Sequence, residues 1–511
     1  MTKRFFLLLI IPLSLSAFTH LWNPVGFPDI FYDEGVYLRR ALHVLDGLGP
    51  QEYATYYDHP FFGQLFLASV FKIIEYPNSL NPSHDLNSIK NLYVVPRVIM
   101  GILAVIDTFL IYKITERRYN RNVAFLASVL FAVMPMSWLT RRVLLDNILL
   151  PFLLASILFA VYSRYKIDNT LKDKHSNNKK KFNHRILYVI LSGIFLGLAV
   201  FTKIPVFVYI PLIAYIIFVN SNRRWKLIGL WFVPVILIPL VWPAYSVVVD
   251  HFDDWINTIV AQTQREGVPP LDSLNRLLKL DPILFILGMA GSVFAFIRRD
   301  LFIILWAIPS ILFHFLMGYY PYREFIPMLP LFCIGGAVLI DYGVNRIKTR
   351  KKPILLAGII SAVGVFGLIS TTMLISTNLT SSQFATAAFI SAYLDNENNK
   401  KENITLISTP IYSWIFKYVY DKDNILPEYR TILFQGIKTD RILLVADQHF
   451  NKGGSNEKLR MIYNSTGIIA GFNGTRKDID TRYYPYTSML LNNEGLHEIE
   501  IRKGNYSKFG P

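Results

Sequence analysis

The sequence has one cysteine, Cys333, and few charged side chains for its 511 residues. A single thiol excludes an internal disulfide and a cysteine-rich metal site. Charged residues make up 17% of the chain and hydrophobic residues 52%, whereas soluble domains are usually about a quarter charged. The sequence also contains no glycine-rich loop of the kind that binds nucleotide phosphates. This composition indicates a membrane protein and argues against a nucleotide-dependent enzyme.

Long apolar runs are what the chain has instead. Eleven of them approach or reach the about 20 residues that a helix needs to cross a bilayer. They lie at residues 5–22, 93–115, 123–139, 148–163, 186–201, 204–219, 227–249, 281–297, 301–318, 325–341 and 354–374. The first run follows a charged start, as in a signal peptide, but it continues to Trp22, and we expect it to remain as a span. The sequence therefore predicts a polytopic α-helical membrane protein with about eleven spans.

The distribution of Lys and Arg predicts the orientation of these spans. The net charge is +16, which in a soluble protein would suggest nucleic acid as a partner. Here the basic residues lie mostly in short loops between apolar runs, where they orient helices. With the N-terminus inside, the inner loops hold 23 Lys and Arg and the longer outer loops hold 11. We therefore expect a multi-pass plasma membrane protein, surrounded by lipid bilayer, with no nucleic-acid partner.

The last part of the chain changes in character. Residues 1–374 form the predicted transmembrane domain, and residues 375–511 the predicted soluble, extracytoplasmic α/β domain. In the second part "NITLIST" and "RILLVAD" read as strands, and "ATAAFISAYLDN" and "IYSWIFKYVY" as helices. All five Asn-x-Ser/Thr sequons of the chain lie here, which fits an outer location and makes their asparagines candidates for N-glycosylation. These are Asn378, Asn403, Asn464, Asn473 and Asn505.

The first outer loop, between the first and second runs, is too long for a simple connector. From Glu34, "EGVYLRRALHVLD" gathers its apolar residues on one helical face, a pattern typical of a helix lying in the membrane interface. The segment "FFGQLFLASVFKII" predicts a second such helix. Between them lies "YYDHP", which we expect to be extended before its proline.

The outer loops collect side chains suited to moving a group off a phosphate. A carboxylate takes the proton from an attacking hydroxyl, and cations hold the departing phosphate. The carboxylates are Asp33, Glu34, Asp58 and Asp146; the cations are His59, Arg142, Lys203 and Arg323; Tyr37, Tyr320 and Tyr322 are further candidates for the cavity.

Each of these residues also has a purely structural explanation. Asp33 and Glu34 would stabilise the start of the interfacial helix by capping and by the helix dipole. Arg142 and Asp146 are four residues apart and would form an ion pair on one helix. Basic side chains at the ends of spans often only place their charged group in the polar interface of the membrane. The functional interpretation depends on their occurring together on one face, in order.

This ordered set resembles the polyprenyl-phosphate-sugar-dependent glycosyltransferases with the GT-C fold, the group of protein O-mannosyltransferases and lipid A aminoarabinose transferases. The resemblance covers residues 1–345 and rests on "DEGVYLRRAL", "DHPFFGQL", "RRVLLDNILL", "FTKIPVF" and "YREFIPMLP". Two departures stand out. Phe61 stands where the family has a second proline, and no Trp-Trp-Asp element is present, which separates the chain from the oligosaccharyltransferases that share the architecture.

By this resemblance the chain transfers a hexose, with mannose expected, from a dolichyl or other polyprenyl phosphate to a hydroxyl on protein or on a lipid-linked glycan. The resemblance gives Asp33 the role of base in a single displacement and makes Asp146 the second acid, and Glu34, beside Asp33, is a further catalytic candidate. It gives donor-phosphate binding to His59, Lys203 and Arg323, and Arg142, a cation on the same face, is a further candidate for this role. No cofactor is required, although Asp33, Glu34, Asp58 and Asp146 together would suit a divalent metal. The alternative is a non-catalytic transporter or scaffold of envelope-glycan assembly.

Overall fold

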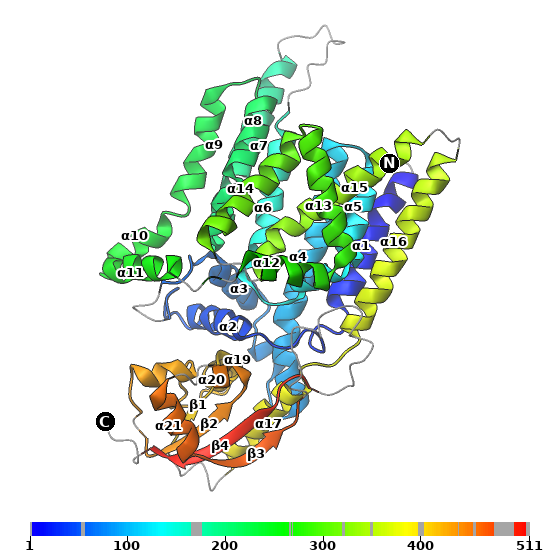
Figure 1. The fold of residues 1–511 in the computed structure, drawn as a ribbon. Helices are drawn as coiled ribbons and strands as arrows, with labels where there is room; N and C mark the ends of the chain where they lie inside the picture. Colours follow the sequence, from blue (N-terminus) through cyan, green and yellow to red (C-terminus); the bar gives the residue numbers. More distant parts are fainter. Residues whose placement is uncertain are drawn as a thin grey trace.

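The computed structural model describes residues 3–52, 57–164, 176–264, 267, 269–318, 322–347, 351–396, 403–437, 439–452, 456–474 and 495–506. Figure 1 shows a bundle of long helices, with a smaller part that contains a sheet packed against one end of it. Two helices, α2 (Tyr32–Leu45) and α3 (Phe62–Ile73), lie at the boundary between the two parts. These are the two helices predicted for the first outer loop.

The bundle contains a helix for each of the eleven predicted apolar runs. The helices of these runs are α1 (Lys3–Leu21), α4 (Leu86–Arg118), α5 (Arg121–Val133), α6 (Leu145–Tyr162), α7 (Ser176–Thr202), α8 (Ile210–Asn220), α9 (Trp225–Leu237), α10 (Val241–Val248), α13 (Pro282–Ile297), α14 (Leu301–Met317), α15 (Leu329–Arg346) and α16 (Lys352–Ile375). Shorter elements are η1 (Asn78–Leu80), η2 (Pro135–Arg141), η3 (Ile204–Tyr209), α11 (Phe252–Thr263), α12 (Pro270–Leu280) and η4 (Tyr322–Met328).

The predicted helical membrane fold is confirmed. Among the described residues, six helices are long and apolar enough to cross a membrane, or up to eight if each bent pair counts as one span. Shorter apolar helices, such as Leu301–Met317, add to these. The figure of eleven spans stays a prediction.

Helix α4 begins earlier than its apolar run, and its first turns reach the C-terminal part. The Asp85 side chain caps it by accepting hydrogen bonds from the backbone N–H groups of Asn87 and Ser88. Two turns later the Tyr93 hydroxyl donates to the carbonyl of Ile411 at 2.7 Å and accepts from the Trp414 indole at 2.9 Å. Helix α4 therefore belongs to the bundle and also contacts the C-terminal part.

The C-terminal part is the predicted α/β structure. Its four strands have the order β1-β2-β4-β3; β1 runs parallel to β2, and β4 is antiparallel to both of its neighbours. The strands are β1 (Ile404–Ile407), β2 (Arg441–Ala446), β3 (Gly467–Phe472) and β4 (Ile499–Asn505), and the helices are α17 (Ser381–Asp395), α19 (Pro410–Trp414), η5 (Ile415–Val419, a π-helix), η6 (Tyr429–Leu433), α20 (Gln448–Lys452) and α21 (Glu457–Ser465).

The two parts share one continuous hydrophobic core. Leu38 and Ala41 of α2 belong to the same buried cluster as Ile411 and Trp414 of α19. The close approach depends on Gly35, because a Cβ at that position would lie 2.2 Å from the Pro410 carbonyl oxygen. The glycine in "DEGV" is therefore explained by contact between α2 and the C-terminal part.

Candidate active site

The site begins at the first turn of α2, where two adjacent acids point in different directions. Successive residues of a helix are about 100° apart around its axis. Glu34 faces inward and its side chain is 0% exposed, whereas the Asp33 side chain is 26% exposed. The paired acids of the sequence therefore have separate surroundings and separate roles.

Glu34 is held on every side. Its Oε1 accepts from the backbone N–H of Phe31 at 2.9 Å, so Glu34 satisfies a backbone donor at the start of α2. The Arg97 guanidinium donates to both carboxylate oxygens at 2.7 and 2.9 Å, and the Val143 N–H donates to Oε2 at 3.1 Å. The helix-capping explanation fits these contacts, and the Glu34 carboxylate fastens α2 to the bundle. A catalytic role for Glu34 stays a prediction.

Asp33 faces an arginine at the surface of the site. The Arg323 guanidinium lies 3.6 Å from the Asp33 carboxylate, and its side chain is 24% exposed. The same guanidinium lies 5.1 Å from the centre of the Phe31 ring, and the Arg142 guanidinium lies 5.0 Å from that ring. Phe31, the residue that precedes α2, thus orders two of the predicted phosphate-binding cations by cation–π contact.

Lys203 lies between two carboxylates. Its ammonium donates to both oxygens of Asp146, at 3.0 and 2.9 Å, and to Glu324 at 2.7 Å. An ammonium has three N–H donors, so all three are used. Burial would lower the pKa of Lys203, but the two carboxylates outweigh that effect and raise the pKa above its ordinary value. Lys203 and Asp146 do meet, as the sequence indicated, but as parts of a buried triad with a net charge of −1.

This imbalance leads to a stability prediction. Asp146→Asn leaves a balanced pair of Lys203 and Glu324, so we expect the free energy of unfolding to fall by no more than about 1.5 kcal/mol. Lys203→Met leaves two carboxylates buried together and should lower it clearly further. Denaturant unfolding of the two purified variants checks the order. Equal losses would mean that the triad is not the unit that the distances indicate.

Arg142 does not pair with Asp146, contrary to the ion pair considered from their spacing. It donates to the Asp29 carboxylate at 2.5 Å, and its side chain is 3% exposed. The other oxygen of Asp29 lies 2.8 Å from Nε2 of His497, a residue of the C-terminal part. Arg142 therefore belongs to a buried link between the bundle and the C-terminal part.

The C-terminal part also covers the start of α2. The Tyr32 hydroxyl donates to Glu428, and the His449 ring packs against the rings of Phe31 and Tyr32. Burial raises the pKa of the Glu428 carboxyl above its ordinary value. Residues on either side of Asp33 are thus in contact with both parts of the molecule.

Three of the predicted acids lie near the Tyr37 hydroxyl and act on its pKa. Burial raises the pKa of its phenol well above the ordinary value, and the negative charges of Asp33, Asp58 and Asp146 raise it further. The phenol therefore stays protonated among three carboxylates. Asp58 is itself paired with Arg40 at 2.7 Å.

Three other predicted residues are less closely defined. His59 is half-buried in the loop before α3. Tyr320 lies outside the described residues, and Tyr322 is described only as the first residue of η4. Their predicted roles stay predictions.

The structure also adds residues that the sequence did not single out: Asp29, Arg97, Glu324 and His497. Only Arg97 carried a signal, because it is a cation inside a predicted span, and charges within spans are usually functional or paired. The other three are ordinary loop or helix-end residues in the sequence.

The four carboxylates proposed for a metal are not gathered. Each is paired with a different cation: Asp33 with Arg323, Glu34 with Arg97, Asp58 with Arg40 and Asp146 with Lys203. Within the described part of the chain, no three His, Cys, Asp or Glu side chains lie close enough to hold an ion. The prediction that these four acids suit a metal is therefore corrected.

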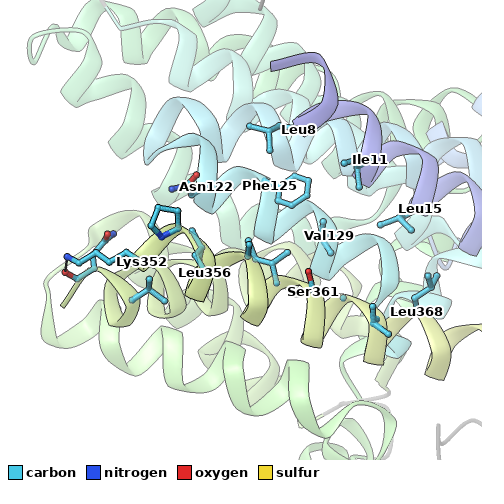
Figure 2. A pocket seen from close by; sticks show the side chains of 17 residues that line it. Leu8, Ile11, Leu15, Asn122, Phe125, Val129, Lys352, Leu356, Ser361 and Leu368 are labelled. Atoms are coloured by element: carbon cyan, nitrogen blue, oxygen red, sulfur yellow. Dashed lines mark hydrogen bonds between the residues drawn. The ribbon is translucent and has the colours of Figure 1, made fainter. Parts of the chain in front are cut away.

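A well-formed cavity of the bundle lies away from these residues. It measures about 600 Å³ and is bounded by α1, α5 and α16. Figure 2 shows mostly apolar side chains along it, such as Leu15, Phe125 and Leu368, with Asn122 and Lys352 at one end. It has no carboxylate among its described lining residues, so it is not the place of the expected chemistry.

Four of the five sequon asparagines are exposed: Asn403, Asn464, Asn473 and Asn505. Asn378 is half-buried, and its side-chain oxygen accepts from the backbone N–H of Thr380 at 3.3 Å. Exposure permits modification but does not establish it, so glycosylation stays a prediction.

Comparisons with known proteins agree with this architecture. Residues 51–250 match the family model described as dolichyl-phosphate-mannose-protein mannosyltransferase. No curated protein matches the sequence. The oligosaccharyltransferase AglB of Archaeoglobus fulgidus, solved with an inhibitory peptide and a dolichol-phosphate, has a TM-score of 0.58 at 12% identity over 92% of this chain and 73% of its own. ArnT from Cupriavidus metallidurans, bound to undecaprenyl phosphate, has a TM-score of 0.55 at 12% identity over 98% and 99%.

Proposed function

We propose that this chain, which is a membrane glycosyltransferase with the GT-C fold, transfers a hexose from a polyprenyl phosphate to a hydroxyl group at the outer membrane face. Mannose is the proposed sugar and dolichyl phosphate the proposed carrier, because residues 51–250 match a family described by that donor. The solved neighbours AglB and ArnT each contain a polyprenyl phosphate, which supports a lipid carrier of this kind.

The observation that carries the mechanism is the exposure of Asp33. Of the three acids proposed for catalysis, only Asp33 is reached by solvent to a substantial degree, at 26%, against 0% for Glu34 and 5% for Asp146. A general base must come within hydrogen-bonding distance of the proton that it removes. An acceptor can reach Asp33 without displacing a buried ion pair.

In the proposed step the Asp33 carboxylate accepts the proton of the acceptor hydroxyl. The hydroxyl oxygen forms a bond to the anomeric carbon, and the bond from that carbon to the phosphate oxygen breaks. The polyprenyl phosphate leaves with the bonding electrons, and no redox partner is needed. Arg323, which lies beside Asp33 and is similarly exposed, supplies positive charge for the phosphate, together with His59.

The geometry favours structural roles for two of the cations that were predicted to bind the phosphate. Lys203 has no N–H group to spare while it holds Asp146 and Glu324. Arg142 is buried against Asp29 and the Phe31 ring. We assign to both the task of keeping the site rigid and dry.

The acceptor is a hydroxyl on a protein or on a lipid-linked glycan. The C-terminal part packs against the start of α2 through His497 and His449, so an acceptor approaching Asp33 meets both parts of the molecule. The alternative of a non-catalytic transporter or scaffold is set aside, because the family match and the fold are those of glycosyltransferases.

The test is transfer of labelled hexoses from a panel of polyprenyl phosphates by the purified chain, offered membrane lipids and proteins of its host. We expect one donor, mannosyl phosphoryl dolichol, to be used, and we expect transfer to persist in EDTA because each site carboxylate already has a cation partner. The matched control donor is GDP-mannose, which should give no product. Transfer from GDP-mannose but from no lipid donor would contradict the proposal.

A further inference from the structure

A polar hollow is lined by residues at the ends of α4 and α6. Figure 1 shows this end of the bundle away from α2 and the C-terminal part. The hollow measures about 440 Å³ and is formed where α4, α6 and α8 end and α14 begins. Three of its lining residues are arginines: Arg117 and Arg118 at the end of α4, and Arg164 just after α6. All three are exposed to solvent.

Among the described residues, an ion pair compensates the charge of one of these three arginines. None of the described residues that line it is acidic. Arg118 is paired with Asp300 at 2.9 Å, but Asp300 lies outside the lining. Positive charges facing one small space repel each other, and a bound anion removes that repulsion. Guanidinium groups match the oxygens of a phosphate in charge and in shape.

Beside the arginines and the polar residues Tyr215, Asn220 and Asn222, the lining has an apolar side, which indicates the kind of anion. Val161, Ile216, Val219 and Phe302 form the wall on the side of the helices. All four belong to apolar helices of the bundle. Val219 is 51% exposed, whereas Val161, Ile216 and Phe302 are buried behind it. A free phosphate would gain nothing from such a wall, whereas the acyl chains of a lipid would cover it.

We infer that this hollow binds an anionic phospholipid, with the phosphate headgroup between Arg117, Arg118 and Arg164 and an acyl chain against Val219. Basic pockets between spans at a membrane surface are suited to such headgroups. The site lies at the opposite end of the bundle from Asp33, so it is separate from the proposed donor site.

A role in orienting the spans does not by itself explain why Arg117, Arg118 and Arg164 line one hollow. Arginines that only set topology need not converge on one hollow. Arg223 and Arg224, in the turn between α8 and α9, lie at the same end of the bundle and are exposed, but they are not part of the lining. They provide a control with the same change of charge at the same membrane surface.

The experiment is thermal unfolding of the purified full chain in a neutral detergent, titrated with phosphatidylglycerol. A ligand that binds only the folded state raises the unfolding temperature. We expect the rise in the wild type and in Arg223→Gln/Arg224→Gln. In Arg117→Gln/Arg164→Gln the half-effective lipid concentration should be roughly thirtyfold higher, at about 1 kcal/mol for each arginine.

Three results would overturn the inference: an equal rise with phosphatidylcholine, an equal rise with inorganic phosphate alone, or the same half-effective concentration in both double variants. The second would indicate a site for a free anion. If the Arg117→Gln/Arg164→Gln variant does not fold, the wild type titrated with the three ligands decides the question.

Discussion

Replacing Asp33 by asparagine should lower the rate of sugar transfer by about 10²–10⁴-fold, because the acceptor hydroxyl then has no base to take its proton. The free energy of unfolding should stay within about 0.5 kcal/mol of the wild type. The side chain is partly exposed, and its ion pair with Arg323 at 3.6 Å is of the surface kind that contributes little to stability. Single-turnover transfer from a labelled lipid donor, together with denaturant unfolding, measures both quantities.

The matched control is Asp272→Asn. Asp272 is an exposed acid in the first turn of α12, so like Asp33 it lies near a helix N-terminus, but it lacks the neighbours of Asp33. It should leave the transfer rate unchanged. If Asp33→Asn transfers sugar at the rate of Asp272→Asn, then Asp33 acts only through the helix dipole and the base is another residue.

The features that could be predicted from the sequence are local ones. An apolar run of membrane length and a strand such as "RILLVAD" are decided by residues within a few turns of each other, and all of the predicted runs and strands have counterparts in the structure. The order of the spans also predicted which side chains lie together at one end of the bundle: Asp33, Asp146, Lys203 and Arg323.

The pairing of the charges could not be predicted, since the partners are distant in sequence. Arg97 is 63 residues from Glu34, and His497 is 468 residues from Asp29. Even the nearby pair of Arg142 and Asp146 was misleading. The i, i+4 rule requires one continuous helix, but Arg142 is extended (φ −81°, ψ 149°) and α6 begins only at Leu145.

Asp33 and Glu34 illustrate most clearly the difference between what the sequence predicts and what packing decides. Sequence alone gives Asp33 and Glu34 the same chemistry, and a resemblance between motifs does not distinguish adjacent acids. Packing separates them, because one side of α2 faces the exposed Arg323 and the other faces the buried Arg97. We therefore expect neighbouring conservative substitutions to fail for opposite reasons, one in catalysis and the other in folding.

Glu34→Gln should destabilise the chain by about 3–5 kcal/mol, the usual cost of removing one partner of a buried ion pair. The Arg97 side chain is 0% exposed, so its charge would be left in the interior without a counter-ion. Arg97 also donates to the backbone carbonyls of Pro24, Pro28 and Asp29, so a shift of its guanidinium would disturb the segment that leads into α2. The loss is a large part of the about 5–15 kcal/mol that stabilises a typical protein.

A double variant distinguishes a buried charge from a merely lost contact. Glu34→Gln/Arg97→Met removes both charges, so it should be more stable than either Glu34→Gln or Arg97→Met alone, because no unpaired charge stays in the core. Denaturant unfolding of all four chains gives the coupling energy. Strictly additive losses would mean that Glu34 is stabilised by the Phe31 and Val143 N–H groups without help from Arg97. A non-additive result would establish that the ion pair between Glu34, the second acid of the motif, and Arg97 stabilises the attachment of α2 to the bundle.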